Sequence, residues 1–114
     1  MTRPEMDRNI FKCRNGEVIT VKVAAVITRL LVNYVINDNP VNPAPGQDLT
    51  FTMDDADNKN VQLTLALTFA QPAGKTGKYT VKISGDPGGV VFTRDYAGAF
   101  GVPVKVIPFF FDVD

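Results

Sequence analysis

The chain has 114 residues, of which 45% are hydrophobic and 21% are charged, with 12 basic and 12 acidic side chains. A chain of this length is most simply one domain, and balanced charge without clustered lysine and arginine argues against nucleic-acid binding. There is no histidine and a single cysteine, Cys13. These counts exclude His-based acid–base catalysis, His-ligated zinc, cysteine-rich metal clusters and an intrachain disulfide. We therefore expect a protein that is not an enzyme.

Polar and charged residues open the chain and predict a flexible N-terminal arm at 1–8, followed by a single domain at 9–114. The arm lacks the apolar segment of a secretory signal peptide. Lys22 and Arg29 interrupt the longest apolar run, at 18–36, so no membrane span is expected. A single cysteine is compatible with the cytoplasm, but the sequence indicates no particular compartment.

The first elements read as strands. Ile10-Phe11-Lys12-Cys13 predicts a short strand, and Asn15-Gly16 is a strong signal for a two-residue hairpin turn. The segment 17–27 then predicts a longer strand, because its apolar residues fall at alternate positions. One face of that strand carries Ile19, Val21, Val23 and Ala25.

The segment 24–36 allows two interpretations. Its apolar residues alternate at even positions from Leu30 to Ile36, whereas the preceding strand uses odd positions. The β-branched content favours two strands joined by a turn or bulge near 28–29. The same spacing also fits one helix over 24–36, which is the alternative.

The second half repeats a unit of a short alternating strand followed by a turn. Three prolines within 37–48 forbid a helix there and predict a loop. The strand at 61–69 has the cleanest alternation, with leucine or another apolar residue at every odd position. Further strands are predicted at 49–53, 77–85, 90–94 and 102–113, with loops or turns at 54–60, 72–76, 86–89 and 97–101.

About eight short strands with turns between them predict an all-β fold, an antiparallel β-sandwich of immunoglobulin-like or jelly-roll-like type. The segment Gly77-Lys78-Tyr79-Thr80-Val81 resembles the tyrosine-corner entry to a late strand of immunoglobulin-like domains. The Cys…Trp…Cys core of that family is missing, since the chain has no tryptophan and one cysteine.

The last strand carries the candidate interface. Pro108 coincides with a shift of the apolar phase, which predicts an edge strand with a bulge. Consecutive strand residues point to opposite faces, so if Phe109 and Phe111 lie in the core, Phe110 faces outward. An exposed phenylalanine on such a strand is a plausible anchor for a protein partner.

A second candidate site is the acidic turn at 54–60, which contains Asp54, Asp55, Asp57 and Asn58. Closely spaced oxygen ligands suit calcium, although aspartate and asparagine are also ordinary turn formers. Together with the loop at 37–48, this turn could also contact a glycan.

Outward strand positions carry threonine, which predicts an uncharged face suited to contact with another sheet. Our first hypothesis is therefore a non-enzymatic interaction or structural module, a subunit of a homo- or hetero-oligomeric assembly. The alternative is a module that binds a glycan or calcium through the loops at 37–48 and 54–60. The five threonines of the predicted face are Thr50, Thr52, Thr64, Thr68 and Thr80.

Overall fold

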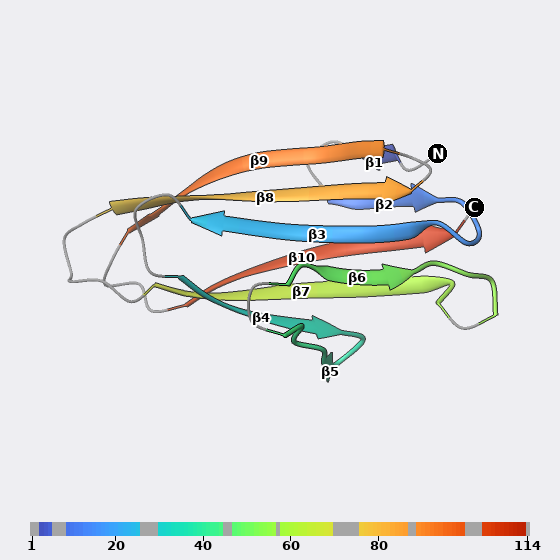
Figure 1. Cartoon of the computed structure of the whole chain (residues 1–114), viewed down its shortest axis with the longest axis horizontal. Coiled ribbons are helices and arrows are strands. Elements are labelled where there is room, and N and C mark those ends of the chain that lie inside the picture. The colour runs from blue at the N-terminus through green and yellow to red at the C-terminus, as the bar shows by residue number, and fades with distance from the viewer. Residues whose placement is uncertain are drawn as a thin grey trace.

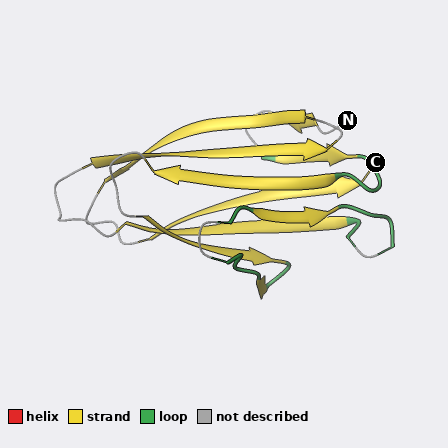
Figure 2. Ribbon diagram, in the orientation of Figure 1, coloured by secondary structure: helices red, strands yellow, loops and turns green. Residues whose placement is uncertain are grey.

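A computed structural model of the chain describes residues 3–5, 9–25, 30–44, 47–56, 58–69, 76–86, 89–99 and 104–113. Within these ranges the protein has ten strands and no helix, arranged in two packed sheets whose long strands run along the molecule (Figures 1 and 2). The prediction of an all-β, sandwich-like fold is confirmed. Across the same ranges, no helix is present that has the length and hydropathy to cross a bilayer.

Two sheets of unequal size make up the fold. The larger has the order β1 (Arg3–Glu5), β2 (Ile10–Cys13), β10 (Val104–Val113), β7 (Asn60–Phe69), β4 (Leu30–Ile36) and β5 (Asn39–Pro40). The smaller has the order β6 (Leu49–Thr52), β3 (Val18–Ala25), β8 (Thr76–Asp86) and β9 (Gly89–Ala99). Neighbouring strands pair antiparallel except β2 and β10, which pair in parallel.

Alternating side chains of both sheets fill one core. On β7, every odd residue from Val61 to Leu67 is buried, while Gln62 is exposed. Phenylalanine rings join the two sheets in edge-to-face contacts, a geometry that aromatic pairs favour. These contacts are Phe11–Phe92 at 5.8 Å, Phe92–Phe109 at 5.6 Å and Phe51–Phe111 at 5.3 Å between ring centroids.

The Asn15-Gly16 turn is present, but the predicted hairpin is wrong. The Glu17 N–H donates to the Arg14 carbonyl at 3.1 Å, and Gly16 has φ +82° while Asn15 has no positive φ. A positive φ at the second central residue only is the type II pattern, which splays the flanking strands. Consistent with that, β2 and β3 enter different sheets. The buried Glu17 carboxylate accepts the Arg14 N–H at 3.0 Å and holds the turn.

The helix alternative for 24–36 is wrong wherever that segment is described. Ala24 and Ala25 end β3, and Leu30–Ile36 forms β4. The change of apolar phase arises because β3 and β4 belong to opposite sheets. The even-numbered side chains Val32, Tyr34 and Ile36 of β4 point toward the shared core, where Tyr34 is buried. The turn predicted near 28–29 lies outside the described residues.

The segment 37–48, predicted to be a loop, contains a short hairpin. Asn37 and Asp38 have φ of 47° and 68°, and β4 returns through them as β5 with Ile36 opposite Asn39. Two central residues with positive φ make a type I′ turn, which asparagine and aspartate favour. Beyond β5, the Val41 N–H donates to the Tyr34 carbonyl at 2.9 Å. This segment therefore covers the edge of the larger sheet.

The last strand is neither an edge strand nor bulged. β10 lies between β2 and β7, and it pairs continuously with β7 from Val104 to Asp112. A proline at position 108 is compatible with this central strand. Residues two apart in a strand direct their backbone N–H groups toward the same neighbouring strand, so Pro108 and Phe110 face the same side. The Phe110 N–H donates to the Asn9 carbonyl on the β2 side, where β2 itself begins only at Ile10. Pro108 therefore faces a position beyond the end of β2, where no ladder donor is needed.

Two segments predicted to be irregular contain strand residues. Within the predicted arm at 1–8, Arg3–Glu5 pairs with β2 as β1. Within the predicted loop at 97–101, residues 97–99 end β9 and pair with the start of β8. In both cases, backbone N–H and C=O groups of a neighbouring strand are available for pairing with the segment. Side-chain patterns do not signal this backbone pairing.

Candidate interaction surface

The two outer faces of the sandwich differ in their exposed apolar side chains. Across the described part of the chain, the large exposed hydrophobic residues are Leu31 (62% exposed), Val106 (59%), Phe110 (37%) and Val18 (37%). The first three lie on the outer face of the six-stranded sheet, because they alternate with buried residues of β4 and β10. We name this surface the apolar face. Its apolar and threonine members are Ile10, Leu31, Val35, Thr64, Ala66, Thr68, Val106, Pro108 and Phe110.

Phe110 has the orientation that the sequence predicts. Phe109 and Phe111 are fully buried, while Phe110 remains 37% exposed. Its neighbours across the strands are Ile10 on β2 and Gln62 on β7. Phe110 therefore stands near the middle of a sheet and not at an edge. Whether it anchors a partner stays a prediction.

The register arranges the apolar face in rows across the strands. One row joins Pro108 on β10, Thr64 on β7 and Val35 on β4. The next row joins Val106, Ala66 and Asn33 in the same order. Directly opposed side chains are close enough to pack together, so each row is a continuous strip of surface.

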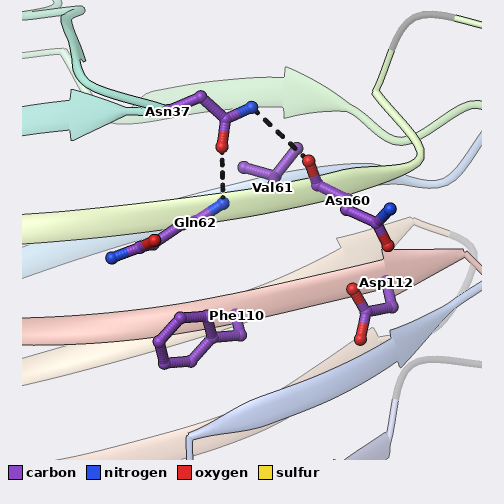
Figure 3. Close-up of a pocket in the computed structure, with 6 residues that line it drawn as sticks. All are labelled: Asn37, Asn60, Val61, Gln62, Phe110 and Asp112. Carbon is purple, nitrogen blue, oxygen red and sulfur yellow. Dashed lines mark hydrogen bonds between the residues drawn. The ribbon is translucent and has the colours of Figure 1, made fainter.

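The apolar face is hollowed at the Phe110 end. A shallow open cavity of about 260 Å³ lies there (Figure 3). Figure 3 shows the Phe110 ring on one side of it and the amide groups of Asn37 and Asn60 on the other. The lining residues are Asn37, Asn60, Val61, Gln62, Phe110 and Asp112.

Hydrogen bonds within the chain occupy the amide group of Asn37. Its side-chain carbonyl accepts the Gln62 N–H at 2.9 Å, and its Nδ2 donates to the Asn60 carbonyl at 3.4 Å (Figure 3). The Asn37 backbone N–H donates to the Gln62 carbonyl at 3.0 Å. The side chain thus continues the ladder between β4 and β7 beyond the end of β4.

Paired charges close the same end of the face. Lys12 Nζ lies 3.3 Å from Asp112 Oδ2 across the parallel pair of β2 and β10. With its amide oriented to donate, Asn60 Nδ2 lies 2.8 Å from Asp112 Oδ1. Lys12 and Asp112 are the charged side chains that point outward from the described parts of β2, β10, β7 and β4. The opposite charges of Lys12 and Asp112 therefore cancel each other on the described outward side chains of these four strands.

The outer face of the four-stranded sheet is polar. Lys22 on β3 lies directly opposite Lys82 on β8, and Thr93 follows on β9. The single threonine face predicted from the sequence is wrong, because the five threonines divide between the sheets. Thr50, Thr52 and Thr80 lie on the smaller sheet, whereas Thr64 and Thr68 lie on the larger one.

The acidic turn holds itself together through its own side chains. The Asp54 carboxylate accepts the N–H groups of Ala56 at 3.0 Å and Asn58 at 3.4 Å. Asn58 Nδ2 donates to the Thr52 carbonyl at 2.9 Å, and Asp55 is exposed. This pattern is that of an aspartate-stabilised turn.

Calcium binding by this turn stays a prediction. Asp57 lies outside the described residues, and within them no three acidic or cysteine side chains come together as a ligand set. Glycan binding by the loops at 37–48 and 54–60 likewise stays a prediction.

The alternation that identifies Phe110 could also have identified Val106. Counting back from Phe109 and Phe111 in steps of two makes Ile107 inward, and Val106 is then outward. The phase shift predicted at Pro108 hides this orientation, because a shift there would place Val106 on the inward face together with Phe109 and Phe111. Asn37 carries a local signal as well, since Asn-Asp favours a type I′ turn.

No protein-family model, curated protein or solved structure matches this chain.

Proposed function

We propose that this protein is a non-enzymatic structural module that self-associates through its apolar face. The observation that supports the proposal is the gathering of Leu31, Val106 and Phe110 on one outer sheet face, out of four large exposed hydrophobic residues among those described. Contiguous exposed apolar surface is unfavourable in water and marks contact sites.

A second copy of this chain suits the apolar face because of its charge. Lys12 and Asp112 neutralise each other within one copy, so two such faces meet without bringing like charges together. The polar outer face of the smaller sheet is different. There Lys22 lies opposite Lys82, and two copies of that face would bring four ammonium groups together.

The size of the face is consistent with a weak dimer. β7 and β10 have ten residues each, and β4 and β2 have seven and four. At about 3.3 Å per residue and about 4.8 Å between strands, these four strands make a face of roughly 500 Å². If the whole face were covered, two copies would bury at most about 1,000 Å², which is the lower limit for a specific interface. We therefore expect association that depends on concentration in the micromolar range.

Light scattering on a sizing column, at several protein concentrations, tests the proposal. The native chain is expected to shift from monomer to dimer as concentration rises, and Phe110→Lys to stay monomeric at all concentrations. Val18→Lys is the matched control, since Val18 has the same 37% exposure on the opposite outer face. Circular dichroism should show both variants folded, because neither side chain belongs to the core. A native chain that is monomeric throughout, or a Phe110→Lys variant that still dimerises, overturns the proposal.

A further inference from the structure

We infer that the two copies meet about a two-fold axis that crosses the strands at the row of Pro108, Thr64 and Val35. This inference rests on the self-association proposed above and adds its geometry. The axis lies between the two faces and reverses the strand direction of one copy relative to the other. Val106 of each copy then lies against Phe110 of the other.

The spacing of residues about this row is symmetric on β10 and β7. Val106 and Phe110 each lie two residues from Pro108. The register places Ala66 level with Val106, and Gln62 level with Phe110, two residues on either side of Thr64. A two-fold contact requires one patch to complement itself, with residue i touching residue j and the reverse. This row divides the apolar face into two halves that meet that requirement.

The two halves have complementary shapes. On one side of the row, Val106 is 59% exposed and stands beside the small side chain of Ala66. On the other side lies the cavity of about 260 Å³ against the Phe110 ring. Rotation about the proposed axis brings the protruding half of one copy over the hollow half of the other. The Val106 side chain then packs against the Phe110 ring at the rim of the hollow.

The hydrogen bonds and the ion pair at the hollow leave room for an apolar occupant beside Phe110. The Asn37 amide is bonded to the backbone of Gln62 and Asn60, and Asp112 is paired with Lys12. A valine side chain can enter the hollow without disturbing these bonds. Burial of the exposed Phe110 ring is favourable because it removes apolar surface from water.

Sheet packing limits the contact to the centre of the face. Aligned sheets cross at about −30° and lie about 10 Å apart, so rows near the axis stay opposed while distant rows diverge. Leu31 lies four residues from Val35 and thus far from the axis. It is not expected to meet Phe110 of the other copy.

Charge substitution at the two facing positions tests the axis. Val106→Lys alone and Phe110→Asp alone are each expected to weaken dimerisation at least 100-fold in sedimentation equilibrium. Combining Val106→Lys with Phe110→Asp in one chain should recover at least tenfold, because the introduced lysine of one copy faces the introduced aspartate of the other. The two positions are four residues apart on one strand, about 13 Å, so they do not pair within a copy. The recovered dimer should weaken with added salt.

Leu31→Lys combined with Phe110→Asp is the matched control and should give no recovery. If both double variants fail to recover while the native chain dimerises, this axis is wrong and self-association stands. If Leu31→Lys with Phe110→Asp recovers dimerisation and Val106→Lys with Phe110→Asp does not, the proposed axis is wrong. Self-association then stands, and the two faces meet in a different register. If the native chain is monomeric, both the axis and the proposed function are wrong. Circular dichroism and urea unfolding of each variant confirm that the fold is retained.

Discussion

The outer faces of the two sheets show how one strand pattern can produce surfaces of opposite character. Both faces consist of the side chains that alternate with buried ones. On the four-stranded sheet these are mainly threonine, serine and lysine, as at Thr20, Ser84 and Lys82. On the six-stranded sheet they include Val106 and Phe110.

Burial in the core explains why inward side chains are apolar on both sheets. It does not explain the apolar side chains that point outward from the six-stranded sheet. Inward positions are apolar on both sheets because folding buries them. Outward positions need no apolar residue, and on the four-stranded sheet the described ones are mainly polar, with Val18 as an exposed hydrophobic residue. Burial in the core of one copy does not account for the outward Phe110 and Val106, which is in line with the proposed contact.

The largest effect on stability is expected from Asn37→Ala, which removes hydrogen bonds at the hollow end of the apolar face. The substitution removes two side-chain hydrogen bonds and places alanine at φ 47°, a conformation that residues with a Cβ other than asparagine disfavour. We expect the free energy of unfolding to fall by about 2 kcal/mol. Urea unfolding monitored by circular dichroism measures it.

The neighbouring position supplies the control for Asn37. Asp38 has φ 68°, which glycine adopts without strain. Asp38→Gly creates Asn-Gly, the preferred type I′ sequence, and should leave stability unchanged or raise it by roughly 0.5 kcal/mol. A loss of stability in Asp38→Gly as large as that in Asn37→Ala would contradict the turn assignment.

A smaller effect is expected on the polar face, from Lys82→Glu. Lys22 lies directly opposite Lys82, and like charges at that position are destabilising. The substitution should raise the free energy of unfolding by roughly 0.5 kcal/mol at low salt, with the gain shrinking as salt is added. Adding Lys22→Glu should cancel the gain by recreating a like-charge pair. Neither variant should change the dimerisation constant, which separates the roles of the two faces.

The smallest effect concerns Tyr34, at the edge of the six-stranded sheet. Burial, and secondly the negative charge of Asp48, raise the pKa of the Tyr34 phenol above its usual 10.0. The folded chain therefore holds this proton more tightly than the unfolded chain. The resulting stability is fully present below pH 10 and is lost as pH rises through the higher pKa of the folded state.

Ultraviolet titration of the phenolate checks this, with Tyr34→Phe identifying the group. Asp48→Asn should lower the Tyr34 pKa, though only in part, since burial is the larger cause. If the pKa of Tyr34 in the folded chain lies at or below the usual 10.0, the placement of the segment 37–48 over β4 is contradicted.

Much of the fold could be read from alternation, because a period of two reports a half-buried strand wherever it occurs. The strands predicted at 10–13, 49–53 and 61–69 agree with the structure to within a residue. Errors arose where the chain changes sheet. The phase change before Leu30 and the turn at Asn15-Gly16 both mark such a crossing, and each has a local pattern that also fits another structure.

The candidate surface was predicted in part. Alternation determined that Phe110 faces outward, and composition determined the absence of histidine chemistry. Neither could determine which strands flank Phe110, because those contacts join distant parts of the chain.

The sequence by itself determined the all-β character and the inward or outward direction of most side chains, since both follow from neighbours within a few residues. Only the tertiary structure decided which strands pair. The parallel contact of β2 with β10 brings Lys12 to Asp112, 100 positions away, and pairs their opposite charges. The same pairing places β10 inside the sheet and Phe110 beside Ile10. Such contacts depend on the packing of the whole core, and no local stretch of sequence encodes them.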